Sequence, residues 1–182
     1  LVDHMKAAGI KRVAYIGYSD ALGDDVYQGL VDAAQKAGIE VVTNERFARA
    51  DTSVTGQVIR ILSTQPDAVM TGGAGTAGAL PYLTLRQRGY NKPIFGPHSL
   101  INPEFIRVGG PAVQGTIVPS GPVVVAEQLE DSNPTKKVAL AFREYYQKAN
   151  NQEAKDSLSP YAFDAWLIMA DAAKRVLAKG VK

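Results

Sequence analysis

A helix-to-strand junction near the start of the chain shows the pattern on which the whole fold is built: Lys6-Ala-Ala-Gly9-Ile10-Lys-Arg12-Val-Ala-Tyr-Ile-Gly17. A cationic side chain complements the partial negative charge at a helix C-terminus, and glycine adopts the left-handed conformation that closes the helix. The β-branched and aromatic residues that follow are typical of a strand. The same junction recurs at residues 35–43 and 86–96. The chain therefore alternates between helices and strands.

Strands are predicted to begin near residues 12, 39, 68, 94 and 115. The number of residues between successive strand starts is enough for a strand, a crossover helix and the loop that leads back to the sheet. Successive strands are therefore expected to run parallel. The helices between them carry apolar stripes, and Asp24 is the candidate N-cap of the helix that ends at Ala37. The pattern predicts an α/β fold with an open, doubly wound, mostly parallel sheet of about five strands.

The last third of the chain is predicted to be helical. Ser132-Asn133-Pro134 is expected to open one helix and Ser159-Pro160 a second, which runs to about Lys179. The first helix has an apolar stripe of Val138, Phe142, Tyr145 and Ala149. The second is apolar nearly all round, which is typical of a helix buried on most sides. We expect residues 1–122 to form an α/β ligand-binding lobe and residues 123–182 a helical segment belonging to another, absent lobe.

The apolar surface of the second helix also predicts self-association. It carries Tyr161, Phe163, Trp166, Leu167, Ile168, Met169, Val176 and Leu177. Soluble monomers rarely expose so large an apolar patch, so we expect two copies to pair through these helices as a homodimer.

Composition excludes several classes of protein. Of 182 residues, 46% are hydrophobic and 21% charged, which is typical of a globular chain rather than a disordered one. The absence of cysteine excludes disulfides, thiolate metal sites and cysteine nucleophiles. A net charge of +2 gives no basic patch for nucleic acid. Because the chain opens within a helix at Leu1, we expect a fragment whose signal peptide, if any, lies upstream.

A glycine-rich loop suggests a nucleotide cofactor, but its context does not. Gly73-Ala-Gly75-Thr-Ala-Gly78 matches the dinucleotide pattern and follows a strand. The pattern also requires an acidic residue at the end of the next strand, where His98 stands instead. We predict no cofactor, and interpret the loop as a small-residue turn that lets the backbone approach a ligand.

Enzyme chemistry is the other alternative. Gly17-Tyr-Ser19-Asp-Ala21 resembles a degenerate nucleophile elbow, and Ser19, Asp67 and His98 would complete a triad. Asp67, however, precedes its strand and should lie at the opposite end of the sheet. Two isolated histidines and no thiol provide no metal cluster. We therefore predict neither catalytic nor metal-binding residues.

The general rule for open α/β sheets predicts where a ligand binds. Ligands lie beyond the carboxyl ends of the strands, at the point where the strand order reverses. For a flavodoxin-like order, this rule selects residues 18–23 and 72–78, with residues 97–100 beside them. Free N–H groups in the turn at residues 72–78 suit an anion or a carbonyl oxygen.

These segments resemble the periplasmic solute-binding proteins of the leucine/isoleucine/valine-binding type. The resemblance rests on their order and spacing: Arg12-Val-Ala-Tyr-Ile, Leu22-Gly-Asp24, Pro66-Asp-Ala-Val-Met-Thr-Gly-Gly73, Pro93-Ile-Phe-Gly-Pro97, Gly115-Thr-Ile-Val and Ser159-Pro-Tyr161-Ala-Phe-Asp-Ala165. It implies one lobe of a two-lobed protein that closes on a small organic solute and delivers it from the periplasm to an ABC permease. Two alternatives remain: the effector-binding domain of a transcription regulator of this fold, and a hydrolase-like or dinucleotide-binding enzyme.

The resemblance also implies which residues contact the solute. They are Leu22 in the first loop, Ala74, Gly75 and Thr76 after the paired glycines, His98, and the aromatic Tyr161. Amino-acid binders carry an acid at the position of His98. An imidazole does not attract an ammonium group as a carboxylate does. We therefore expect a carboxylate without an α-amine, aromatic or aliphatic, rather than leucine or valine.

Overall fold

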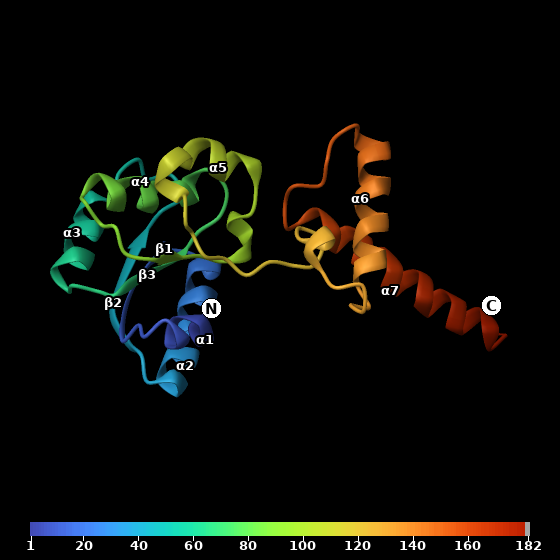
Figure 1. Ribbon diagram of the computed structural model, residues 1–182, viewed down its shortest axis with the longest axis horizontal. Helices are drawn as coiled ribbons and strands as arrows, with labels where there is room; N and C mark the ends of the chain where they lie inside the picture. Colours follow the sequence, from blue (N-terminus) through green and yellow to red (C-terminus); the bar gives the residue numbers. More distant parts are fainter. Residues whose placement is uncertain (181–182) are drawn as a thin grey trace. The chain divides into compact units, whose positions relative to one another are not determined.

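The computed structural model describes residues 1–180 and divides the chain into two compact units, of which Leu1–Pro119 is the first. This unit contains a parallel sheet with the strand order β2-β1-β3-β4. The strands are β1 (Arg12–Tyr18), β2 (Glu40–Phe47), β3 (Ala68–Gly72) and β4 (Ile94–Phe95) (Figure 1). The predicted α/β class and the parallel sheet are confirmed.

The fifth strand, expected near residue 115, is reduced to one bridge. Ile117 pairs with Phe95 alone, donating its N–H to the Ile94 carbonyl and accepting from the Gly96 N–H. Gly115 adopts a left-handed φ of 75° just before the bridge. Pro119, which has no N–H, follows two residues after Ile117. Among the described residues the sheet therefore has four strands, and β4 is only two residues long.

Helices cover both faces of this sheet (Figure 1). Helices α1 (Val2–Ala7) and α2 (Ala21–Ala37) pack on one face with Val13, Tyr15 and Met70. The opposite face is covered by α3 (Thr55–Ser63), α4 (Leu80–Gln87) and α5 (Pro103–Gly109). Three-residue and four-residue turns of 3-10 helix occur at Ala77–Ala79, His98–Leu100, Gly110–Val113 and Ala126–Gln128.

The repeated helix-to-strand junctions form as predicted. Gly9, Gly38 and Gly89 have φ values of 75°, 71° and 81°, the left-handed region that ends a helix without a side-chain clash. The predicted cap of α2 is wrong, because Asp20 rather than Asp24 occupies the N-cap. Asp20 is extended and its carboxylate accepts the Gly23 N–H, so α2 begins four residues earlier than predicted.

Strand β2 forms an outer edge of the sheet and is mostly half-buried or exposed. Two of its carboxylates are engaged in ion pairs, Glu40 with Arg12 and Glu45 with Arg60, each at 2.6 Å. This edge therefore carries charge along its length.

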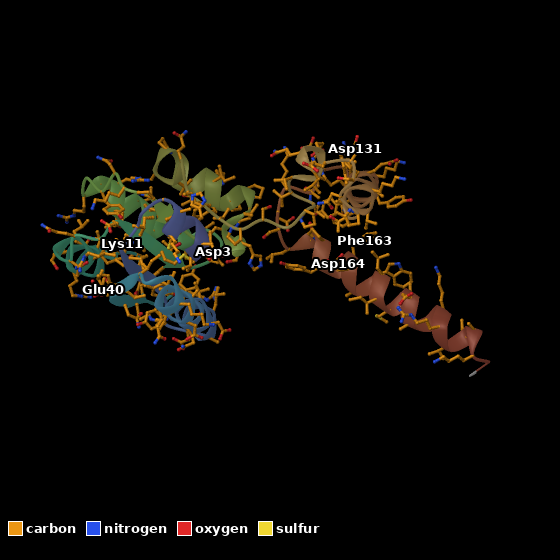
Figure 2. The ribbon with its side chains drawn as sticks, turned by 60° about the horizontal axis from the view of Figure 1, so that its bottom comes forward. Asp3, Lys11, Glu40, Asp131, Phe163 and Asp164 are labelled. Atoms are coloured by element: carbon orange, nitrogen blue, oxygen red, sulfur yellow. The ribbon has the colours of Figure 1, made fainter. Side chains whose placement is uncertain are left out.

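The second unit, from Ser120 onward, contains α6 (Lys136–Asn150) and α7 (Ser159–Ala178). Helix α6 begins two residues after Pro134, because the Asn133 side chain accepts the Thr135 N–H and holds the turn. The Phe142 ring packs against Phe163 at 5.2 Å between centroids. Figure 2 labels Phe163 and Asp164 near the start of α7.

The predicted apolar stripe of α6 is only partly buried. Phe142 is buried, whereas Val138 and Tyr145 are 46% and 62% exposed, because this unit has few elements to cover them. Most of α7 is exposed as well, with Trp166 at 63% and Ile168 at 70%. Within residues 1–180, none of the helices is both long and apolar enough to cross a membrane.

Candidate functional site

The carboxyl ends of the strands meet at one edge of the first unit. β1 pairs with β2 on one side and with β3 on the other, so the strand order reverses at β1. Gly17 and Gly72 lie side by side at the ends of β1 and β3. This is the switch point at which open α/β sheets bind ligands. The loops after β1, β3 and β4 surround it.

Polar groups of the first of these loops bond to residues at and just after the end of β2. The Ser19 N–H donates to the Phe47 carbonyl, and Asp20 forms an ion pair with Arg49 at 2.6 Å. This hydrogen bond from Arg49 lowers the pKa of Asp20 below its usual value. Leu22 lies in the first turn of α2, half-buried against the core.

Two arginines from the end of β2 flank this loop. The Arg46 guanidinium lies 5.2 Å from the Tyr15 ring centroid and 5.1 Å from that of Tyr27. It also donates to the Tyr18 carbonyl at 3.0 Å. The Arg49 guanidinium lies 4.3 Å from the centroid of the Tyr18 ring. Sequence reasoning missed both arginines, although their positions at the end of a predicted strand were visible.

The loop after β3 is a tight turn of small residues. Gly75 has a left-handed φ of 57°, and a Cβ on Gly73 would lie 3.1 Å from the Gly78 Cα. A Cβ on Gly78 would lie 2.9 Å from a methyl group of Leu100. The glycines at these three positions are thus explained by the backbone conformation and the close packing of the turn.

His98 begins the turn after β4 and is half-buried. Its neighbour Ser99 donates a hydrogen bond to the Gly73 carbonyl at 2.9 Å, which places the two loops side by side. Five of the predicted contact residues therefore lie at one edge of the sheet, Leu22 in the first turn of α2 and the others in the loops after β3 and β4: Ala74, Gly75, Thr76 and His98. Their contact with a solute remains a prediction.

Tyr161, the sixth predicted contact residue, lies in the second unit. It is 55% exposed in the first turn of α7. Together with Phe142 and Phe163 it lines a cavity of about 270 Å³ within that unit. Its predicted contact with a solute stays a prediction.

The candidate triad does not assemble. Asp67 lies at the amino edge of the sheet, where its carboxylate accepts the N–H groups of Lys11 and Arg12, both at 3.0 Å. These hydrogen bonds lower its pKa. Ser19 and His98 follow the carboxyl ends of their strands, at the opposite edge. Among residues 1–180, no cluster of three histidine or carboxylate side chains is arranged to hold a metal ion.

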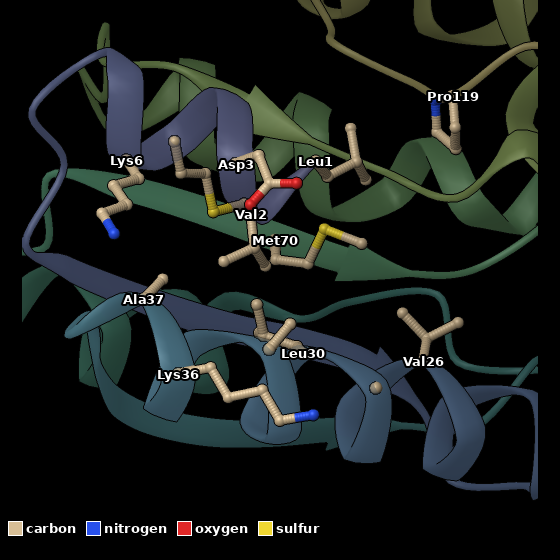
Figure 3. Close-up of a pocket in the computed structure, with 13 residues that line it drawn as sticks. Leu1, Val2, Asp3, Lys6, Val26, Leu30, Lys36, Ala37, Met70 and Pro119 are labelled. Carbon is tan, nitrogen blue, oxygen red and sulfur yellow. The ribbon is translucent and has the colours of Figure 1, made fainter.

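A separate cavity of about 490 Å³ lies between α1 and α2 (Figure 3). Its apolar lining includes Leu30 and Met70, with Lys6 and Lys36 among the polar groups. None of the six predicted contact residues lines it.

A parallel sheet whose carboxyl-edge loops adjoin at the switch point defines an α/β ligand-binding lobe. Comparison with known proteins identifies the protein family to which this lobe belongs. The family model described as "Periplasmic binding protein" matches residues 1–181. The chain belongs to this family, and its fold matches one lobe of a type I periplasmic binding protein.

Several relatives are similar over much of the chain. An extracellular ligand-binding receptor from Rhodopseudomonas palustris HaA2 is 37% identical over 97% of this chain and 49% of its own, with a TM-score of 0.89. A Rhodospirillum rubrum protein provisionally assigned to a branched-chain amino acid ABC transporter is 26% identical over 96% of this chain and 48% of its own, with a TM-score of 0.75.

The Leu/Ile/Val-binding protein BraC3 of Rhizobium johnstonii is 31% identical over 59% of this chain. That alignment covers 29% of the Rhizobium protein. This chain also spans about half the length of the two solved relatives.

Proposed function

We propose that this protein is the solute-binding component of an ABC importer, which captures a small organic solute in the periplasm and delivers it to a membrane permease. Membership of the periplasmic binding protein family supports this role. The observation that carries it is the arrangement of the loops after β1, β3 and β4, joined by hydrogen bonds at one edge of the sheet. The Rhodospirillum rubrum relative supports the coupling to an ABC transporter.

Binding, rather than turnover, is the activity that fits these residues. The only triad that the sequence suggested is divided between opposite edges of the sheet, with Asp67 engaged by the Lys11 and Arg12 amides. The loops at the carboxyl edge can hold a solute by backbone groups and side chains without reacting with it.

The solute that we propose is a carboxylate without an α-ammonium group. His98 stands beside the loop at residues 73–76, where the resemblance led us to expect an acid. A neutral or protonated imidazole gives an ammonium group no counter-charge. The name of the Rhizobium relative refers to leucine, isoleucine and valine. We propose that this protein differs from that relative in its preference.

The test compares leucine with isocaproate, which has the same side chain and no amine, and with benzoate. Calorimetry of the full-length protein should show binding of an acid and weaker binding of leucine. His98→Glu should shift the preference toward leucine, because a carboxylate attracts the ammonium group. His4→Glu, at the exposed histidine of α1, is the matched control and should change neither. Tight leucine binding that His98→Glu fails to improve would contradict the proposed solute class.

A further inference from the structure

Two hydroxyl groups hold consecutive carbonyls of the loop at residues 73–76. Tyr18 Oη donates to the Ala74 carbonyl at 2.6 Å, and Ser99 Oγ donates to the Gly73 carbonyl at 2.9 Å. The donors come from different elements, since Tyr18 ends β1 and Ser99 lies in the turn after β4. The loop is therefore held by β1 on one side and by the turn after β4 on the other, and the Ala74 carbonyl also accepts the Gly78 N–H at 3.2 Å.

These two hydrogen bonds also determine where the loop amides point. In a trans peptide the C=O and N–H groups point in opposite directions. The Gly73 carbonyl shares its peptide with the Ala74 N–H, and the Ala74 carbonyl with the Gly75 N–H. Both N–H groups therefore face away from the clamping hydroxyls. Within residues 1–180, neither donates a hydrogen bond to a backbone carbonyl. Successive free amides of this kind suit an anionic or carbonyl oxygen.

Tyr18 is itself held in place before any solute arrives. Its side chain is 1% exposed and its ring packs on Phe47 at 5.0 Å between centroids. The Arg49 guanidinium covers the same ring and is anchored by its ion pair with Asp20. The hydroxyl is thus presented to Ala74 by a rigid support. Such support lowers the entropy cost of ordering the loop when a ligand binds.

We propose that Tyr18 and Ser99 are positioning residues for solute binding. Their hydroxyls hold the loop so that the Ala74 and Gly75 amides are ready to receive a carboxylate oxygen of the solute. This inference rests on the proposed function. Loss of either hydroxyl leaves the fold intact, loosens the loop and weakens binding of an acid about tenfold, the size expected for one well-placed hydrogen bond.

The test uses Tyr18→Phe and Ser99→Ala, each with a matched control. Tyr90→Phe removes a buried hydroxyl that has no hydrogen-bond partner among the described residues. Ser63→Ala removes a hydroxyl that bonds the Arg60 carbonyl at the end of α3. Backbone order parameters of residues 74–76, measured by NMR without ligand, should fall from about 0.85 toward 0.6 in the two test variants only. Calorimetry of the full-length protein and its variants with isocaproate and benzoate measures the affinity.

The outcomes separate this inference from the proposed function. An ordered loop in both Tyr18→Phe and Ser99→Ala would overturn the positioning role, as would a loosened loop with unchanged affinity. If the unaltered full-length protein binds no acid, the proposed solute class fails, and the ligand-free order parameters still decide whether the hydroxyls position the loop. Should Tyr18→Phe fail to fold, Ser99→Ala provides the same readouts alone.

Discussion

Substitution of Gly72 by alanine tests how closely β3 and β1 fit together. An alanine Cβ at this position would lie 1.8 Å from the hydroxyl oxygen of Tyr15 and 2.7 Å from Cζ of the same ring. Tyr15 is fully buried, and its hydroxyl donates to the Gly23 carbonyl at 2.6 Å. The ring cannot yield without losing this hydrogen bond, which joins β1 to the first turn of α2.

The magnitude follows from two contributions. Overpacking of a core costs about 1–3 kcal/mol, and loss of the hydrogen bond to Gly23 adds roughly 0.5–1.5 kcal/mol. We expect Gly72→Ala to lower the free energy of unfolding of the first unit by about 3 kcal/mol. With a denaturant dependence of about 1.5 kcal/mol per molar, the urea midpoint should fall by about 2 M.

A double substitution identifies the cause. Tyr15→Phe alone should cost about 1 kcal/mol. In combination with Gly72→Ala it removes the nearest atom, so the pair should cost about 1–2 kcal/mol less than the sum of the single effects. Gly29→Ala is the control, because nothing lies within 4 Å of a Cβ there. In the interior of α2 it should stabilise by up to about 1 kcal/mol.

Urea unfolding followed by circular dichroism, together with hydrogen exchange of the β1 and β3 amides, measures these effects. Tryptophan fluorescence does not follow this unit, since Trp166 lies in the second. Strictly additive effects of Tyr15→Phe and Gly72→Ala would refute the reasoning, because they would show that the two side chains do not compete for the same space.

Three further predictions concern acid stability, association and affinity. Because hydrogen bonds from the Lys11 and Arg12 amides lower the folded-state pKa of Asp67, its stabilising effect is present above about pH 4 and is lost as the pH falls through that lower pKa. Asp67→Asn should flatten this acid limb in urea midpoints measured from about pH 2 to 7. Light scattering at several concentrations should show a dimer. Trp166→Glu should convert the dimer to the monomer, since this side chain is 63% exposed. A single 19.4 kDa species at every concentration of the unaltered chain would contradict pairing. The 182-residue chain alone should bind acids weakly, because lobe closure supplies much of the burial of a ligand; sub-micromolar binding by the monomer in calorimetry would show otherwise.

The sheet was predictable because its signals are local. Each junction at Gly9, Gly38 and Gly89 combines a cationic turn with a glycine that needs a left-handed φ, and both effects act within a few residues. The cap of α2 was predicted wrongly, since Asp20 and Asp24 are equally good N-cap residues in sequence. The Ser19–Phe47 hydrogen bond joins this turn to the end of β2, a contact outside the local pattern.

The candidate site was predictable only as a set of loops. The switch-point rule located residues 18–23, 72–78 and 97–100, because it depends on strand order alone. The hydrogen bonds that hold residues 73–76 come from the hydroxyls of Tyr18 and Ser99. These two residues are separated in sequence from the carbonyls they bind by 56 and 26 residues. The orientation of a hydroxyl over such a separation depends on tertiary packing, which no local pattern specifies.

The two outer edges of the sheet affect how readily the protein aggregates at high concentration. A bare strand edge is a template for fibril growth, because its unpaired amides can recruit another chain. Growth on β2 would require desolvating the ion-paired carboxylates of Glu40 and Glu45. Growth beyond β4 is restricted because this strand has only two residues and its outer side is already bonded to Ile117. Aggregation through the sheet is thereby suppressed at both ends, and crowding of this protein would favour contacts between helices instead.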